Sequence, residues 1–229
     1  MALSDDLTKE VAKVFGDKWT ERSGTVVPDS TSLGLGNDAI KLDATVLYAD
    51  LADSTRLVDS SKPHFAAEIY KAFLHCAAKI IRDEGGEITA YDGDRIMAVF
   101  IGVSKNTTSA RTALKINYAR NEIVNPALKA QYPASTYQVR HVVGVDTSPL
   151  FVARTGVRGA NDLVWVGRSA NHAAKMSALT SDFPSRITEE VYQRLQPELK
   201  HTNGKAMWER VTWPDMGRVL YRSTWQWSV

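Results

Sequence analysis

Apolar side chains recur along this chain at two spacings, which predict strands alternating with helices. Residues 44–49 form an apolar run broken only by Thr45, which is typical of a buried central strand. Residues 63–83 carry apolar side chains every three or four positions, which predicts an amphipathic helix. Further strands are predicted at 86–91, 95–101, 137–145, 151–153, 163–166 and 186–187, and within 208–227. Further helices are predicted from Thr107 or Thr108 to about 130, at 171–179 and at 188–195.

The N-terminal part of the chain carries a different pattern. Apolar side chains at helical spacing predict a helix over residues 4–19; they are Leu7, Val11, Val14 and Phe15. Residues 23–37 are rich in Gly, Ser and Thr, which indicates a linker. We therefore predict an N-terminal helix and linker at 1–40 and one α+β domain at 41–229. The helix is expected to be a packing appendage rather than a regulatory element.

Composition narrows the class of protein. The 229 residues are 44% hydrophobic and 24% charged, as in ordinary globular domains. A formal net charge of +2 is too small to indicate binding to nucleic acid or to a membrane surface. Cys76 is the one cysteine, so there is no disulfide framework, and no apolar run reaches membrane-spanning length. We expect a cytoplasmic protein without a nucleic-acid partner or a membrane span.

Two aspartates mark the candidate chemistry. Asp50 ends the first central strand, and the helix-capping residues 53–55 follow it. Asp92-Gly93 predicts a type I′ hairpin turn, and Asp94 comes directly after it. A hairpin packed beside the first strand would bring Asp94 to the same end of the sheet as Asp50. Two carboxylates there suit two hard cations bound against a triphosphate.

Three separated motifs then indicate a family. They are Val46–Thr55, Gly85–Phe100 and Val166–Lys175, and they occur in this order. Together they resemble the catalytic domain of class III nucleotidyl cyclases, the adenylate and guanylate cyclase family. The resemblance covers roughly residues 42–195 and is more specific than any single motif. It implies a ferredoxin-like α+β domain, an antiparallel-rich sheet with helices packed on it, that works as a head-to-tail homodimer.

The resemblance assigns roles to individual residues. It implies that Asp50 and Asp94 bind two divalent cations, Mn²⁺ or Mg²⁺, and that Leu51 lends a backbone carbonyl to one of them. Asn171 matches the asparagine that orients the nucleotide ribose. Lys175 stands where the family usually has an arginine that stabilises phosphate charge in the transition state. Lysine keeps this positive charge but lacks the bidentate fork of arginine.

The residues expected to contact the phosphates fit the family, but those expected to contact the base differ from the residues of purine cyclases. The backbone N–H groups expected to cradle the β- and γ-phosphates belong to Ala52, Asp53, Ser54 and Thr55. Ala90 and Val164 replace the two polar residues with which purine cyclases read their base, so purine recognition should be lost. Tyr48 and Arg95 are larger polar residues that could fill the space beside a smaller base. This pattern resembles the pyrimidine cyclases of bacterial antiphage (Pycsar-type) defence.

The resemblance therefore implies conversion of UTP to 3′,5′-cyclic UMP and pyrophosphate. The Asp50/Asp94 surface of one copy would meet the Asn171/Lys175 surface of another, which gives composite sites in a homodimer. The product would act as a second messenger, read by a separate effector protein. Three alternatives stay open: a cytidylate cyclase, an adenylate or guanylate cyclase, and a catalytically degenerate cyclase fold that senses nucleotides.

Overall fold

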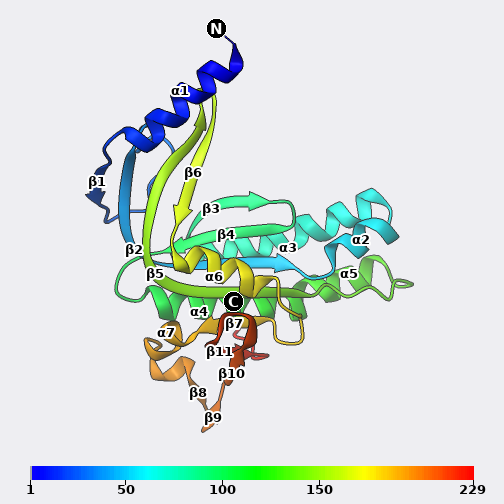
Figure 1. The fold of residues 1–229 in the computed structure, drawn as a ribbon. Coiled ribbons are helices and arrows are strands. Elements are labelled where there is room, and N and C mark those ends of the chain that lie inside the picture. Colours follow the sequence, from blue (N-terminus) through cyan, green and yellow to red (C-terminus); the bar gives the residue numbers. More distant parts are fainter. Residues whose placement is uncertain (1) are drawn as a thin grey trace.

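A computed structural model describes residues 2–229 and shows one twisted sheet with helices on both faces (Figure 1). The helices are α1 (Leu3–Gly16), α2 (Ser54–Ser60), α3 (Pro63–Asp83), α4 (Lys105–Ala119), α5 (Asn125–Gln131), α6 (Arg168–Ser177) and α7 (Glu189–Gln193). A π-helical turn, η1 (Arg120–Val124), joins α4 to α5, and the 3₁₀ turns are η2 (Pro197–Leu199) and η3 (Pro214–Met216). The strands are β1 (Thr20–Ser23), β2 (Asp38–Leu51), β3 (Glu87–Asp92), β4 (Arg95–Phe100), β5 (His141–Val157), β6 (Ala160–Val166), β7 (Ser185–Thr188), β8 (His201–Thr202), β9 (Lys205–Ala206), β10 (Glu209–Trp213) and β11 (Arg218–Ser223).

The long strand β2 lies at the centre of the sheet. The strand order is β10-β11-β7-β5-β2-β4-β3, with β1 beside β2 and β6 beside β5. The pairings are antiparallel except β1 with β2 and β5 with β7, which are parallel. The predicted α+β fold, an antiparallel-rich sheet with helices packed on it, is confirmed.

Side-chain alternation along β2 divides the core into two layers. Leu47, Ala49 and Leu51 point to one face, where α3 and α4 cover them. Leu42, Ala44 and Val46 point to the other face and pack with residues of α6. Asp50 is an even number of residues from Leu42, Ala44 and Val46, so its side chain lies on the same face of the sheet, the one that α6 covers.

Several boundaries differ from the prediction. The central strand begins at Asp38 rather than at residue 44, so the domain boundary drawn at residue 40 falls inside β2. Strand β5 begins at His141 and runs unbroken to Val157, where two strands, 137–145 and 151–153, were predicted. It is continuous because β2 pairs with it along thirteen consecutive residues, a long-range contact with no local signal.

The predicted helix from residue 107 or 108 to about 130 is three pieces. It begins at Lys105, passes through η1 and restarts as α5, with Pro126 in the first turn of α5. Proline has no N–H for the preceding turn, which explains the interruption. The strands predicted within 208–227 are confirmed as β10 and β11, but only β10 lies at the edge, because β11 pairs with both β10 and β7. Trp213 of β10 is buried against the sheet, as expected.

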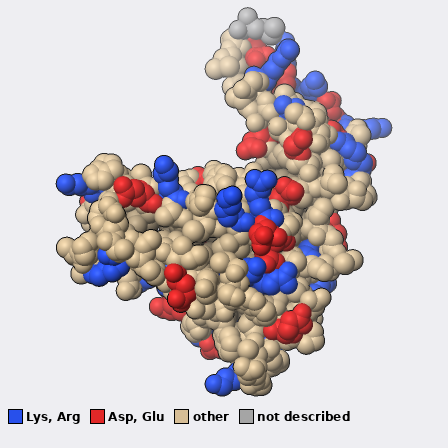
Figure 2. Space-filling model, turned by 180° about the vertical axis from the view of Figure 1, so that it is seen from behind, with Lys and Arg blue, Asp and Glu red and all other residues tan. Residues whose placement is uncertain are grey.

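The N-terminal helix α1 exists, but its expected packing is wrong. None of its described residues is buried, and it projects from the rest of the molecule (Figure 2). Its C-terminus is fixed by Asn37, whose Nδ2 donates to Val14 O at 2.9 Å and Asp17 O at 2.8 Å. Within residues 2–229, no helix has both the length and the apolar character needed to cross a membrane.

Candidate active site

The hairpin β3–β4 brings the two aspartates together. Arg95 pairs directly with Asp50 across β4 and β2, and Asp94 is the residue before it. The turn lies one residue later than predicted, since Gly93 and Asp94 are its central residues between the paired Asp92 and Arg95. Gly93 has a φ of 61° and Asp94 has no positive φ, as in a type II′ rather than a type I′ turn.

The electrostatic surroundings of Asp50 favour a cation. Burial raises the pKa of Asp50 to about 6; Arg95 opposes this shift, and the carboxylates of Asp94 and Asp92 add to it. The Arg95 Nε lies 3.3 Å from Asp50 Oδ2, so this arginine holds the only ion pair that Asp50 makes within residues 2–229. A metal ion bound to Asp50 would take over the position that the guanidinium holds in this structure.

Asp94 also fits a cation. Its Oδ2 is buried and accepts no hydrogen bond from any residue that the structure describes. A buried, unpartnered carboxylate oxygen is costly unless another group, such as a metal ion, satisfies it. Within residues 2–229, no group of three or more His, Cys, Asp or Glu side chains is placed so that it could hold a metal ion. A cation here would therefore have two carboxylates and would draw its other ligands from backbone and substrate oxygens, as Mg²⁺ commonly does.

The residues expected near the base gather on the same face. Tyr48 lies two positions before Asp50 on β2 and pairs with Met97, which in turn pairs with Ala90. Tyr48 and Ala90 pack on the α6-side cluster, and burial raises the pKa of Tyr48, which Arg95 opposes. Val164 lies elsewhere, because its neighbours Leu163 and Trp165 pack toward that cluster and Val164 points away.

In the loop after Asp50, the hydrogen bonds and ion pairs of Ala52 and Asp53 differ from the prediction. Asp53 is the N-cap of α2 with a φ of 59°, but its side chain makes no cap bond and pairs with Arg140 instead. The Ala52 N–H donates to Arg140 O at 2.9 Å, so it is not free to bind a phosphate. The N–H groups of residues 53–55 remain available. A cavity of about 480 Å³ beside them is lined by Arg56 and Arg140, two cations that the sequence reasoning missed.

Asn171 and Lys175 occupy a second surface. Both are exposed and one turn apart on α6, whose opposite side is buried against the sheet. Lys175 Nζ lies 3.6 Å from Met216 Sδ. In the part of the chain that the structure describes, no hydrogen bond or ion pair joins either residue to Asp50 or Asp94. Within one copy, then, no contact that the structure describes joins the two halves of the predicted site.

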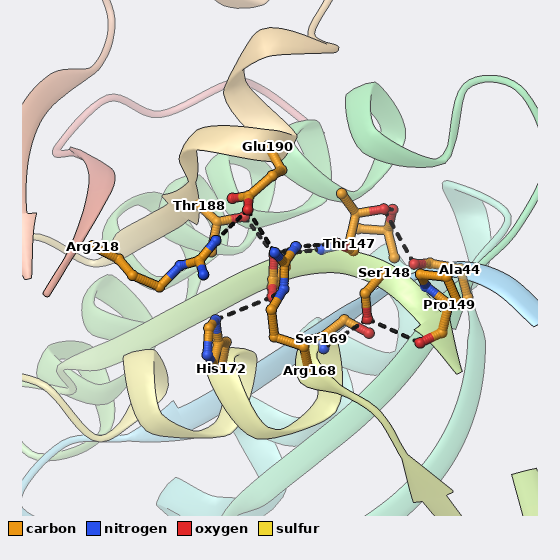
Figure 3. Close-up of polar contacts among 12 residues, drawn as sticks. Ala44, Thr147, Ser148, Pro149, Arg168, Ser169, His172, Thr188, Glu190 and Arg218 are labelled. Carbon is orange, nitrogen blue, oxygen red and sulfur yellow. Dashed lines mark hydrogen bonds and ion pairs between the residues drawn. The ribbon is translucent and has the colours of Figure 1, made fainter. Parts of the chain in front are cut away.

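A buried charge network fixes the start of α6 (Figure 3). Asp146 is fully buried and accepts hydrogen bonds from the Thr147 N–H at 2.7 Å and the Thr188 hydroxyl at 2.5 Å. Arg168 contacts it through Nε at 3.2 Å and donates to Glu190 at 2.5 Å. Burial raises the pKa of Asp146, while Thr188 and Arg168 oppose the shift. The network ties α6 to β5, β7 and α7, which positions the helix that bears Asn171.

A glycine sets the depth at which α6 packs. A Cβ at Gly144 would lie 2.3 Å from the Ala173 carbonyl oxygen of α6, far closer than such atoms approach. Only glycine lets the two backbones come this near. Gly144 also pairs with Tyr48 on β2, so the same contact places α6 against the strand that ends at Asp50.

Solved structures with this fold are class III cyclases. The chain superposes on a bacterial light-regulated adenylyl cyclase with a TM-score of 0.70 and 17% identity, over 84% of this chain and 54% of that one. It superposes on the guanylyl cyclase Cya2 with a TM-score of 0.68 and 18% identity, over 82% and 94% of the two chains. For the adenylyl cyclase CyaB from P. aeruginosa the TM-score is 0.66 at 17% identity, over 81% and 95%. The architecture is therefore the class III cyclase fold.

Sequence relatives specify the family further, although no family model matches the chain. A uridylate cyclase of Xanthomonas perforans and one of Burkholderia cepacia are each 53% identical to it over the full length of both chains. A uridylate cyclase of Rhodovulum sp. (strain MB263) is 34% identical over 98% of this chain and 97% of its own. The chain belongs to this uridylate cyclase family, and it is a nucleotide cyclase.

Proposed function

We propose that the protein converts UTP to 3′,5′-cyclic UMP and pyrophosphate. The observation that carries the proposal is that Asp94, which has a buried and unpartnered Oδ2, lies next to Asp50. The chain that holds this pair is 53% identical to proteins named uridylate cyclase. The names of these relatives favour UTP over CTP as the substrate.

The reaction is an intramolecular displacement at the α-phosphate. The ribose 3′-oxygen bonds to the α-phosphorus, the bond from that phosphorus to the bridging oxygen breaks, and pyrophosphate leaves while the hydroxyl proton passes to water. When bound, two divalent cations, Mn²⁺ or Mg²⁺, acidify the 3′-hydroxyl and neutralise phosphate charge. Asp50 and Asp94, with the Leu51 carbonyl, would hold them. The N–H groups of residues 53–55 would bind the β- and γ-phosphates.

The remaining catalytic groups come from a second copy in this proposal. Asn171 orients the ribose, and Lys175 neutralises charge that develops on the α-phosphate. Because no hydrogen bond or ion pair joins these residues to the two aspartates within residues 2–229, a head-to-tail homodimer is proposed to complete two equivalent sites. The exposure of Asn171 and Lys175 supports this arrangement, since both side chains are free to reach a partner.

Tyr48 and Arg95 would read the pyrimidine. They lie on the same face as Asp50, and Ala90 beside them offers no hydrogen bond to a purine. A site that lacks polar partners for the purine edge discriminates strongly against it. The product is proposed to be a second messenger of antiphage defence, read by a separate effector protein, and the enzyme is proposed to be cytoplasmic.

Incubation of the purified protein with each of the four nucleoside triphosphates and Mn²⁺ tests this proposal. We expect cyclic UMP from UTP, little or no product from ATP and GTP, and no product when EDTA removes the cation. Cyclic CMP as the main product would make the protein a cytidylate cyclase. Cyclic AMP or cyclic GMP would overturn the pyrimidine assignment, and binding without any product would indicate a nucleotide sensor.

A further inference from the structure

Helix α1 carries an apolar stripe that no other part of residues 2–229 covers. The exposed fraction of these side chains runs from 52% for Val11 to 86% for Phe15; the stripe is Leu3, Leu7, Val11, Val14 and Phe15. A helix of 14 residues is marginal in water unless tertiary packing supports it. The support for this face must therefore come from outside the chain.

The stripe is held at a defined place on the molecule. Asn37 caps the last carbonyls of α1, and β1 follows within four residues and pairs with β2. Trp19, between α1 and β1, packs edge-on against Phe151 of β5 at a ring-centroid distance of 5.0 Å. Helix α1 consequently lies across the far end of the β5–β6 hairpin (Figure 1). A presented apolar face of this kind is typical of an interface.

The pattern of the stripe is self-complementary. Leu3, Leu7, Val11 and Phe15 follow one another at intervals of four, so the row is symmetric about Lys9. In an antiparallel pair related by a twofold axis, Leu3 of one copy faces Phe15 of the other and Leu7 faces Val11. Rows at i±4 spacing on both helices interlock in the commonest class of helix packing. A twofold contact requires a surface that matches itself in this way.

The charges beside the stripe favour the same antiparallel arrangement. Asp6, Glu10 and Lys13 follow one edge of it at helical spacing. When two copies pair antiparallel about a twofold axis, like edges meet, which brings Asp6 of one copy near Lys13 of the other. The acidic first turn and the basic last turn complement the dipole of their own helix. The mixed charges of α1 do not form the basic face that interfacial membrane helices carry.

We propose that α1 is a dimerisation helix, whose apolar stripe pairs antiparallel with α1 of a second copy of this chain. The pairing goes beyond the proposed catalytic site, because α1 contributes none of the site residues. It supplies a partner for the one large apolar face of the N-terminal segment. It also raises the local concentration of a second copy, which the composite active site requires.

Self-association of the full-length chain tests the proposal, measured by sedimentation velocity over a range of concentrations. Val11→Glu puts a charge in the stripe, and Ala12→Glu puts the same charge about 100° around the helix as a matched control. We expect Val11→Glu to weaken association at least about tenfold and Ala12→Glu less than about twofold. Because α1 has no buried residue within one chain, both variants should keep the wild-type melting temperature at concentrations where the chain is monomeric. Equal association of both variants would overturn the proposal.

Charge reversal tests the antiparallel geometry. Asp6→Lys and Lys13→Asp should each weaken association, and the double variant should restore it to within about threefold of wild type, because the attraction is re-formed with its sign exchanged. A double variant as weak as the singles would overturn the α1–α1 pairing. Stripe-dependent binding to phosphatidylglycerol–phosphatidylethanolamine vesicles with unchanged self-association would also overturn it. Cyclic UMP synthesis, measured separately, decides the proposed function whichever way association turns out.

Discussion

Asp50→Asn is expected to lower cyclic nucleotide synthesis about a thousandfold while making the metal-free fold more stable. The amide is the same size as the carboxylate but has no negative charge, so it is a poor ligand for a hard cation. The site would lose one of the two carboxylates that meet there. Activity is measured as product formed from UTP, and stability as denaturant unfolding in EDTA.

The stability gain should depend on pH with a definite sign. Burial raises the pKa of Asp50 from its ordinary value of 3.8 to about 6, so the folded chain binds this proton more tightly than the unfolded chain. The stability that this proton contributes is present below pH 3.8 and is lost as pH rises through 6. Asp50→Asn cannot lose a proton and so avoids this loss. The difference in free energy of unfolding between the variant and wild type should therefore grow as pH rises from 3.8 to 6, and reach at most about 3 kcal/mol at pH 7.5.

Asp92→Asn is the matched control for Asp50→Asn. Asp92 is an exposed carboxylate that also pairs with Arg95, but it lies on β3 and outside the proposed cation site. It should keep activity within about threefold and show no comparable pH-dependent gain. If Asp50→Asn kept a tenth or more of wild-type activity, the assignment of Asp50 as a metal ligand would be wrong.

Arg95→Met is expected to separate cation binding from base recognition. In this structure Arg95 pairs with Asp50, so a cation must compete with the guanidinium for the same carboxylate. Removing the guanidinium should tighten binding of Mn²⁺ to the nucleotide-free protein by about tenfold, because the cation no longer competes with a positive charge for the Asp50 carboxylate. The same change should lower kcat/KM for UTP by about a hundredfold, since a polar contact to the base is lost.

Free Mn²⁺ measured by electron paramagnetic resonance gives the first quantity, and steady-state kinetics with UTP give the second. Arg82→Met is the control, because Arg82 is an exposed arginine on the outer helix α3. Arg82→Met should change neither the affinity for Mn²⁺ nor kcat/KM for UTP. Weaker Mn²⁺ binding by Arg95→Met would contradict the competition, and unchanged kcat/KM would remove Arg95 from the list of base-reading residues.

Much of the fold follows from local signals. The apolar run before Asp50 favours a buried strand, the glycine after Asp92 favours a hairpin turn, and the stripe on α3 favours a helix packed on a sheet. A hairpin packed beside the central strand brings its turn to one end of the sheet, so the sequence could place Asp94 near Asp50. The register that sets Arg95 opposite Asp50 comes from the pairing of β4 with β2, which has no local signal.

The remaining features depend on contacts far apart in the chain. The burial of Asp146 is tolerable only because Arg168 and Thr188, 22 and 42 residues away, supply its hydrogen bonds. The ion pair of Arg140 with Asp53 spans 87 residues and has no local signature. For α1 the amphipathic pattern states that one face needs a partner, but the pattern does not state which surface supplies it.

Subunit complementation tests the composite active site most directly. Asp50→Asn and Asn171→Ala should each abolish synthesis of cyclic UMP when expressed alone. When the two chains are co-expressed, half of the dimers pair one chain of each kind. Each such dimer has one intact site, which should restore about a quarter of wild-type activity. A mixture no more active than either variant alone would show that one chain builds its site by itself and would contradict the account.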